Sequence, residues 1–475
     1  MTKVKVRLGI LTRRQIAIGL LVALLFYLNG VLFTQAQNII TTLHSFNSSD
    51  GAYPFAGLIM SGNMLYGTTT GDNFGNSGTV FAIQTDGTGF TNLHSFNGND
   101  GAYLWGGLTL SGDTLYGTAE LGGSTGNGTV FTAKTNGMDF TNLYGFPTEN
   151  DGFYPRAGVV VSEDTLYGTT SGGGSAELYG TVFSVHTDGS GHTNLHSFSA
   201  TSGGVSSGNN EDGANPNAGV ILSGNTLYGT AQFGGQSGFG VVFTVNTDGT
   251  GFTNLHSFRG SNNGAYPIAG LITSGNRLYG TTKSGGSSDN GVVFALNTDG
   301  TGFTNLHSFT AFSSNFPSNT DGAMPQAPLT LSDNILYGTT QTGGVWGRGV
   351  AFAINTDGTG FTNLYSFSGI KDGADPLGGL ILSSNTLYGT TDSGGDSTKG
   401  TVFALTLVPT LSIVPADNQI VLSWPTWAPQ YGLQETANLT SGSWSNITNG
   451  IIDTGANYVL TNSVNGAAFF RLKAL

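Results

Sequence analysis

The sequence predicts an all-β protein: a seven-bladed β-propeller followed by a small β-sandwich of the immunoglobulin or fibronectin type. Three observations support this prediction. The tetrapeptide Leu-Tyr-Gly-Thr recurs seven times, each repeat carries four short β-type runs, and helical periodicity is absent from the repeats. Four strands in each of seven repeats are typical of a propeller. The alternative, a parallel β-helix, usually has shorter rungs and lacks tight two-strand hairpins.

Composition excludes several other classes. The chain has 475 residues, 77 of them glycine, without a Gly-X-Y period, so it is not collagen. A hydrophobic content of 38% is too high for a disordered chain. Beyond the first 36 residues, 10 Lys and Arg face 28 Asp and Glu, a net charge of −18. Such a surface repels nucleic acid and anionic membranes, so neither is predicted as a partner.

Residues 1–36 have the layout of a secretory signal peptide. A basic stretch ends at Arg14, an apolar run covers 16–33, and Thr34 and Ala36 are small residues at −3 and −1 of a cut before Gln37. We therefore expect an exported protein, extracellular or at the cell surface, with the periplasm included. The alternative is an uncleaved N-terminal anchor, because this run could just span a bilayer. No later segment could. The chain has no cysteine, so its stability comes from core burial without disulfides.

The repeats occupy residues 38–407. In the first repeat the four predicted strands are 57–61, 64–69, 79–85 and 90–96, separated by Gly-, Asn- and Asp-rich turns. The Leu-Tyr-Gly-Thr motifs begin at Leu65, Leu115, Leu166, Leu227, Leu278, Leu336 and Leu387.

The two ends of the repeat array are complementary. Residues 42–46 are a fourth-strand motif with no blade before them, and residues 400–405 are a third-strand motif with no fourth strand after them. We expect the N-terminal strand to complete the last blade and to close the ring, which removes two open sheet edges.

This repeat, with LYGTT, GG, GTVF and TNLHSF in order, resembles the GloVer (Gloeo/Verruco) repeat of exported bacterial proteins over nearly the whole mature chain. The resemblance implies an extracellular repeat protein. The tail, residues 410–475, resembles the small β-sandwich endings of such proteins, and its short alternating strands predict a sandwich.

Comparison of the seven copies identifies a candidate binding face. Segment lengths are nearly constant except after the fourth strand, where two copies carry insertions at 199–211 and 310–320. Loops tolerate insertion and carry function on a rigid scaffold. In a propeller these connections share a face with the Gly-rich loops, so we expect the insertions and the Gly-rich tips to lie together.

One position in each copy varies in chemistry while its neighbours stay nearly fixed. It follows Asp-Gly-Ala-Tyr-Pro at the entry to the innermost strand, so we expect it to surround the mouth of the central channel. Its occupants either recognise a ligand at the axis or are solvated and unconstrained, and the sequence leaves both interpretations open. They are Phe55, Trp105, Arg156, Asn217, Ile268, Gln326 and Leu377.

Aromatic and charged side chains on this face are the candidate ligand-binding residues. Aromatic rings stack on sugars or anchor a protein partner, and arginines donate hydrogen bonds. Packing of the aromatic rings against neighbouring loops is the alternative. The candidates are Trp105, Arg156, Trp346, Arg348, Phe312, Phe316, Glu211 and Asp212.

No catalytic residue, metal site or cofactor is predicted. Acidic loops such as 392–396 would offer oxygen ligands to Ca²⁺, but without an EF-hand pattern. Histidine recurs on the fourth strand, but Tyr144 and Tyr365 replace it in two copies, which indicates structural packing or hydrogen bonding rather than metal binding. The histidines are His44, His94, His196, His256 and His307.

The leading functional hypothesis is a non-enzymatic extracellular or cell-surface binding scaffold for a glycan or a protein. The alternative is a polysaccharide hydrolase or lyase on the same face. A glycosidase needs two carboxyl groups roughly 5–10 Å apart. Glu211 with Asp212 in the longer insertion, and Glu120 or Glu177 in the Gly-rich loops, could supply them. The third hypothesis is a purely structural envelope protein.

Overall fold

A computed structural model describes residues 38–474 apart from short gaps, and the predicted signal peptide lies outside it. The gaps are residues 73–76, 175–178, 205–207, 314–316, 410, 417–418, 426–430, 438–442, 455–456 and 464–468. In the described part the helical segments are two 3-10 turns, η1 (Glu149–Asp151) and η2 (Ser261–Asn263), and the regular structure is otherwise β-strand. The all-β prediction is confirmed, and the arrangement is propeller-like.

Residues 39–406 form seven four-stranded antiparallel sheets, and the first six are built from consecutive strands. Sheet 1 has β2 (Ile59–Ser61), β3 (Met64–Thr69), β4 (Thr79–Gln84) and β5 (Thr91–Ser95). Sheet 2 has β6 (Thr109–Ser111), β7 (Thr114–Ala119), β8 (Thr129–Lys134) and β9 (Thr141–Gly145). Sheet 3 has β10 (Val160–Ser162), β11 (Thr165–Thr170), β12 (Thr181–His186) and β13 (Thr193–Ser197).

The next three sheets repeat this plan. Sheet 4 has β14 (Ile221–Ser223), β15 (Thr226–Ala231), β16 (Val241–Asn246) and β17 (Thr253–Ser257). Sheet 5 has β18 (Ile272–Ser274), β19 (Arg277–Thr282), β20 (Val292–Asn297) and β21 (Thr304–Ser308). Sheet 6 has β22 (Thr330–Ser332), β23 (Ile335–Thr340), β24 (Val350–Asn355) and β25 (Thr362–Ser366). The predicted strands of the first repeat differ from sheet 1 by at most two residues at an end.

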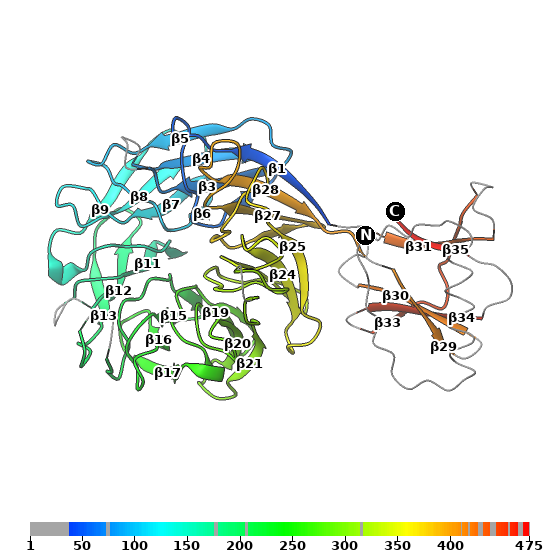
Figure 1. Cartoon of the computed structure of the whole chain (residues 1–475). Helices are drawn as coiled ribbons and strands as arrows, with labels where there is room; N and C mark the ends of the chain where they lie inside the picture. Colours follow the sequence, from blue (N-terminus) through cyan, green and yellow to red (C-terminus); the bar gives the residue numbers. More distant parts are fainter. Residues whose placement is uncertain are drawn as a thin grey trace.

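Sheet 7 combines the two ends of the array. Its strands are β26 (Ile381–Ser383), β27 (Thr386–Thr391), β28 (Thr401–Thr406) and β1 (Ile39–Ser45). β1 pairs antiparallel with β28, from Ile39 opposite Thr406 to Ser45 opposite Thr401. Figure 1 shows the sheets following one another around a ring, with blue β1 beside orange β28. The N-terminal strand therefore occupies the edge that the last repeat leaves open.

Each sheet is buried on both faces, because its side chains alternate between two neighbouring sheets. Val80 packs toward sheet 2, whereas Phe81, the next residue of β4, packs toward sheet 7. Seven hydrophobic clusters result, each shared by two adjacent sheets. The cluster between sheets 7 and 1 contains the fully buried ring of Phe46, which directly follows β1.

One side-chain hydrogen bond recurs between all neighbouring sheets. The threonine of each Leu-Tyr-Gly-Thr motif donates its hydroxyl to a carbonyl of the next sheet, at 2.8–3.3 Å. In sheet 7 this donor is Thr390, and its acceptor is Ala56 of sheet 1. At the same seam the Lys399 ammonium lies 2.9 Å from the Tyr53 hydroxyl and 3.7 Å from the Asp72 carboxylate. Contacts between the last and the first sheet thus match those elsewhere in the ring.

The glycine of Leu-Tyr-Gly-Thr makes room for the phenylalanine opposite it. In sheet 5, Gly280 pairs with Phe294, and a Cβ on Gly280 would lie 2.7 Å from Phe294 Cζ. The other six copies have the same arrangement, at 2.5–2.7 Å. This close approach explains why the two motifs occur together in every repeat.

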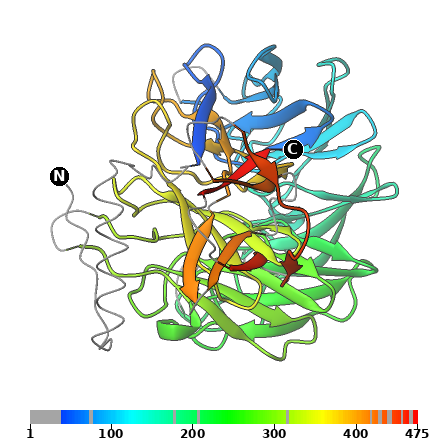
Figure 2. The same ribbon diagram turned by 90° about the vertical axis from the view of Figure 1, so that its right-hand side faces the viewer.

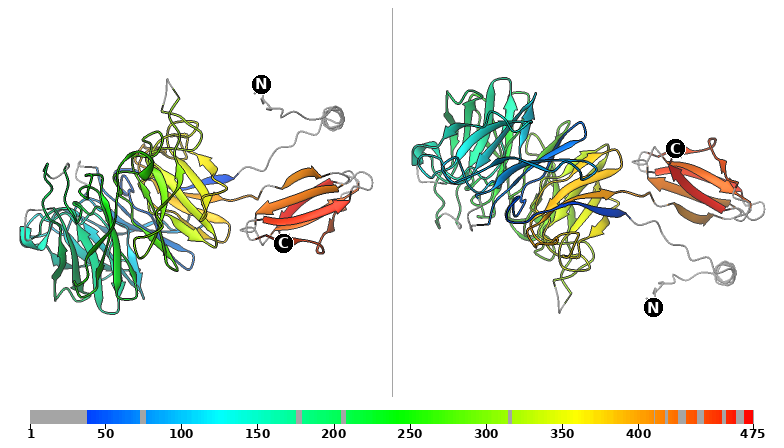
Figure 3. Two further views of the ribbon diagram at one scale, coloured as in Figure 1. Left: turned by 90° about the horizontal axis from the view of Figure 1, so that it is seen from below. Right: turned by 90° about the horizontal axis from the view of Figure 1, so that it is seen from above.

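The tail forms two further sheets, which stand beside the ring in Figures 1 and 3 and in front of it in Figure 2. One contains β29 (Ser412–Ala416), β30 (Gln419–Pro425), β34 (Asn457–Ser463) and β33 (Ile452–Asp453). The other contains β32 (Ser445–Asn446), β31 (Tyr431–Thr436) and β35 (Phe469–Ala474). Leu433 of the second sheet shares a core with Leu422, Trp424 and Leu460 of the first. The tail therefore has a hydrophobic core of its own.

Replacing Gly280 by Ala should destabilise the ring by about 1–3 kcal/mol, because the new methyl group overlaps a ring that cannot move. The matched control is Gly270→Ala, where the nearest atom to a new Cβ is 3.8 Å away. Thermal and denaturant unfolding of both variants checks the prediction. Equal stability of the two would contradict it.

Deletion of residues 38–46 should lower the melting temperature of the whole repeat region. The deletion removes β1 and Phe46, and loss of a buried phenylalanine alone costs about 3–5 kcal/mol. A truncation after residue 411, which removes the tail sheets, is the control for shortening the chain. Calorimetry in which the repeat transition is unchanged by the first deletion would show that closure by β1 contributes nothing.

Candidate functional site

A cavity lies at the centre of the ring and is lined by residues of all seven sheets. Its volume is ≈ 690 Å³, within the range of small-molecule sites. All seven residues of the variable position line it, from Phe55 of sheet 1 to Leu377 of sheet 7. The placement at the channel mouth thus agrees with the sequence prediction.

The backbone that presents these residues is strained in the same way in each copy. Two residues before each lining residue, a non-glycine residue has a left-handed φ of 54–60°. In sheet 1 this residue is Tyr53, and its amide donates to the Lys399 carbonyl of sheet 7. The other six amides donate to the preceding sheet in the same way, at 2.8–3.0 Å. The hydrogen bond offsets a conformation that costs about 1–3 kcal/mol, and it fixes where the next side chains point.

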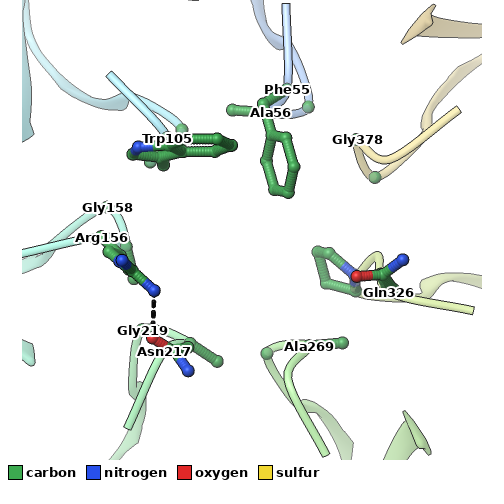
Figure 4. Close-up of a pocket in the computed structure, with 18 of the residues that line it drawn as sticks. Phe55, Ala56, Trp105, Arg156, Gly158, Asn217, Gly219, Ala269, Gln326 and Gly378 are labelled. Atoms are coloured by element: carbon green, nitrogen blue, oxygen red, sulfur yellow. Dashed lines mark hydrogen bonds between the residues drawn. The ribbon is translucent and has the colours of Figure 1, made fainter. Parts of the chain in front are cut away.

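One side of the mouth is apolar. Phe55 and Trp105, from sheets 1 and 2, meet edge to face with ring centroids 4.6 Å apart. Figure 4 shows the Phe55 ring and the six-membered ring of Trp105 projecting toward the centre. Leu377 of sheet 7 continues this side. Sheets 7, 1 and 2 therefore offer a hydrophobic, aromatic wall.

The other side is polar and begins with an ion pair between a buried carboxylate and an exposed guanidinium. Glu120 is 8% exposed and accepts a hydrogen bond from Arg156 Nε at 2.8 Å, and Arg156 Nη2 lies 2.7 Å from the same carboxylate oxygen. Arg156 Nη1 lies 3.5 Å from the Asn217 side-chain oxygen, and Asn217 in turn donates to Gln232 at 2.5 Å. This chain links sheets 2, 3 and 4 and holds the guanidinium at the cavity. Figure 4 shows the contact between Arg156 and Asn217.

Sequence comparison missed a second variable position, the one after Leu-Tyr-Gly-Thr-Thr/Ala. It holds Thr70, Glu120, Ser171, Gln232, Lys283, Gln341 and Asp392. Gln232 and Lys283 line the cavity, and Gln341 bonds to the lining residue Gln326. The variety at this position was visible in the seven copies and could have identified it.

The remaining candidates lie on outer loops and do not line the cavity. Trp346 (56% exposed) and Arg348 stand on the sixth Gly-rich loop, beside the insertion 310–320, where the Asn319 amide donates to the Gly344 carbonyl. Phe312 of that insertion is half-buried. Phe316 lies outside the described residues, as does Glu177. The structure therefore brings Trp105 and Arg156 together at the cavity and places Trp346 and Arg348 elsewhere.

Glu211 and Asp212 end the other insertion and do not form a pair of free carboxylates. Glu211 is exposed, whereas the Asp212 carboxylate accepts hydrogen bonds from Ser199 and lies 3.0 Å from His196 Nε2. Burial disfavours ionisation of Asp212, but these hydrogen bonds outweigh it and lower its pKa. Asp212 is a structural partner of the insertion loop.

The recurrent histidines take similar structural positions. His44, His94 and His307 each contact the aspartate of the following Asp-Gly turn at 2.9–3.1 Å. Each also stacks on an aromatic ring of the next sheet, as His94 does on Phe140, with centroids 3.6 Å apart. Within the described residues, no three His, Cys, Asp or Glu side chains cluster closely enough to hold a metal ion.

An acidic pair stands on sheet 7. Burial, together with the charge of Asp375, raises the pKa of Asp392 from 3.8 to about 6. The Asp392 amide donates to the Asp375 carbonyl, and Ser393 donates its hydroxyl to the Asp375 carboxylate at 2.7 Å. Neither carboxylate lines the cavity. The acidic pair therefore stands on one of the three sheets that form the apolar wall, but outside the cavity lining.

These features define a propeller-like repeat protein with a cavity of ligand size at its centre. Residues 19–209, 204–320 and 310–419 match the model of the Gloeobacter/Verrucomicrobia repeat, and the chain belongs to that family. The resemblance seen in the sequence motifs is thereby confirmed. No curated protein matches the sequence of this chain. In the described part of the chain, no helix is long and apolar enough to cross a membrane.

Solved structures with similar backbones share little sequence with this chain. An oligogalacturonate lyase in complex with manganese is 12% identical, with a TM-score of 0.46, and the match covers 79% of this chain and 96% of that one. TolB from Acinetobacter baumannii is 12% identical (TM-score 0.37; 74% and 69% covered). A chain of a nidogen/laminin complex is 14% identical (TM-score 0.38; 63% and 91% covered).

Replacing Asp392 by Asn should stabilise the protein at pH 7.5 and lose this effect below about pH 4. The folded state raises the pKa of Asp392 to about 6, so it binds more protons than the unfolded state between pH 4 and 6. Stability of the native chain therefore falls as the pH rises through this window. Melting temperatures of both proteins from pH 3.5 to 8 check this, with Asp396→Asn, an exposed acid of the same loop, as the control. A gain that does not depend on pH would contradict it.

Proposed function

We propose that the protein is an exported, non-enzymatic binding scaffold, a seven-bladed propeller that takes a glycan at the mouth of its central channel. The observation that carries the proposal is the cavity itself. Its volume is ≈ 690 Å³, and the one position at which the repeats differ most in chemistry supplies a lining residue from every sheet. Function on a repeat scaffold is expected at such positions, because packing does not constrain them.

The composition of the lining supports a sugar ligand. Sugars are bound by aromatic faces and edges together with planar hydrogen-bonding side chains. The mouth offers Phe55 and Trp105 on one side and Arg156, Asn217 and Gln326 on the other. Amide and guanidinium groups match hydroxyl groups, which both donate and accept hydrogen bonds. Arg156 is already oriented by Glu120, so less conformational entropy is lost on binding.

The alternative, a hydrolase or lyase, has less support at this cavity. Its described lining residues include no Asp or Glu, whereas a glycosidase places two carboxyl groups across its cleft. Glu120 stands behind Arg156 and is neutralised by it. The lining thus favours binding without turnover.

Export and the tail complete the proposal. We propose that residues 1–36 direct secretion, and that the chain then acts outside the cell or at its surface. Residues 410–475 would form an immunoglobulin- or fibronectin-like sandwich, which the two tail sheets and their shared core support. Seven four-stranded sheets, with β1 completing the last, support a closed seven-bladed ring.

Trp105→Ala should abolish glycan binding, whereas Trp346→Ala should not affect it. Trp105 lines the cavity, and Trp346 is exposed on an outer loop, so the pair separates the two candidate locations. A thermal-shift screen with oligosaccharides checks this, since a ligand at 100 times its Kd adds about 2.7 kcal/mol. Trp105→Phe keeps a ring in place if the alanine variant does not fold. Loss of binding in Trp346→Ala alone would move the site to the outer loops.

A further inference from the structure

We propose that the glycan taken at the channel mouth is an acidic one, whose carboxylate or sulfate group lies between Arg156 and Lys283. This inference rests on the proposed function and specifies its ligand class. It follows from the way charge and polarity are distributed around the ring.

The cavity lining is cationic in a strongly acidic protein. The whole chain carries a net charge of −13, yet Arg156 and Lys283 line the cavity and no described Asp or Glu does. The acidic surface repels an anion at long range, so attraction of an anionic ligand would depend on the cations that line this cavity. Focused positive potential in a concave site attracts and orients an anionic group.

The two cations differ in how they are compensated. Arg156 is paired with Glu120 at 2.7 Å, which fixes its position and offsets its charge. Lys283 is half-buried, and among the described residues its ammonium has no hydrogen bond or ion pair. Opposite charges attract at close range, so an ammonium without a counter-ion in the protein favours an anionic partner. A carboxylate or sulfate of the ligand would supply the missing partner.

The donors around these cations form one continuous sector. Arg156, Asn217 with Gln232, and Lys283 come from the consecutive sheets 3, 4 and 5. The guanidinium and the amides lie in the hydrogen-bonded chain already described, so several N–H donors converge on the same side. Charge-assisted hydrogen bonds to an anion are about twice as strong as neutral ones.

The rest of the ring fixes the orientation of the ligand. Phe55 and Trp105 on sheets 1 and 2 suit the apolar face of a sugar ring. Asp375 and Asp392 stand on sheet 7, which is not one of the three sheets that carry the donors. An anionic group is thus repelled from one side and attracted to the other, so the acidic group meets sheets 3–5 and the ring meets sheets 1 and 2.

The test is calorimetric titration of the full mature chain with three tetrasaccharides. One is built of uronic acid units, one of sulfated hexose units and one of neutral hexose units. We expect the acidic ligands to bind more tightly, with an affinity that falls as salt is raised. Lys283→Gln should weaken binding of the acidic ligands roughly tenfold more than binding of the neutral one. The control, Lys371→Gln, removes the same charge from an exposed lysine that does not line the cavity.

The outcomes separate the two proposals. Stronger binding of the uronic acid than of the sulfated sugar, or the reverse, identifies the acidic group, and sensitivity to Lys283→Gln supports the inference in either case. Equal binding of neutral and acidic sugars, unaffected by Lys283→Gln, overturns the acidic ligand but retains the glycan site. Absence of binding to all three overturns the proposed function together with this inference. Lys283→Met, which keeps the length of the side chain, replaces the glutamine variant if that protein is unstable.

Discussion

Contact between neighbouring sheets is the constraint on which the rest of the structure depends. The hydroxyl of Thr68 bonds to sheet 2, and the equivalent threonine in every later sheet bonds to the sheet that follows it, until Thr390 bonds back to sheet 1. Each sheet also places alternate residues of one strand, such as Val80 and Phe81, into two different cores. A single sheet would expose both apolar faces, so the array gains stability only as a ring. This is the physical reason that the N-terminal strand β1 completes the sheet of the last repeat.

The same contacts separate scaffold from site. The glycines, phenylalanines and threonines of the repeated motifs pack or form hydrogen bonds within and between sheets. Seven residues with a left-handed backbone, such as Tyr53, donate their amides to a carbonyl of the preceding sheet. The variable position at the entry to the innermost strand escapes these demands, and all seven of its residues line the cavity. Because the backbone there is fixed by hydrogen bonds to the neighbouring sheet, side chains can vary without altering the ring. Variation among the repeats is therefore concentrated where a ligand would bind.

The backbone repeats regularly around the ring, but the side chains at the cavity do not, so the two sides of its mouth differ in polarity. Phe55 and Trp105 make one side of the mouth apolar, and Arg156, Asn217 and Lys283 make the other a donor surface. Glu120 holds Arg156 at the cavity: one carboxylate oxygen accepts a hydrogen bond from Nε and lies 2.7 Å from Nη2. On sheet 7, burial and the charge of Asp375 raise the pKa of Asp392. The two acids add to the difference in charge between sheet 7 and the sheets that carry the cations. In the proposed function, this polarity across the ring, rather than any single residue, would define which ligand is accepted.

The sequence by itself determined the repeat, the strands and the turns, because these depend on near neighbours in the chain. The four strands of sheet 1 lie within two residues of their predicted bounds, and the complementary ends of the array predicted the pairing of β1 with β28. Comparison of the copies also placed Trp105 and Arg156 at the channel. Tertiary structure alone decided which side chains meet across sheets. Glu120 and Arg156 are 36 residues apart and belong to different repeats, and Asp212 is taken by His196 and Ser199 rather than left for a ligand. Such contacts depend on how neighbouring sheets pack against one another around the ring. Residues that are close together in the chain do not predict this packing.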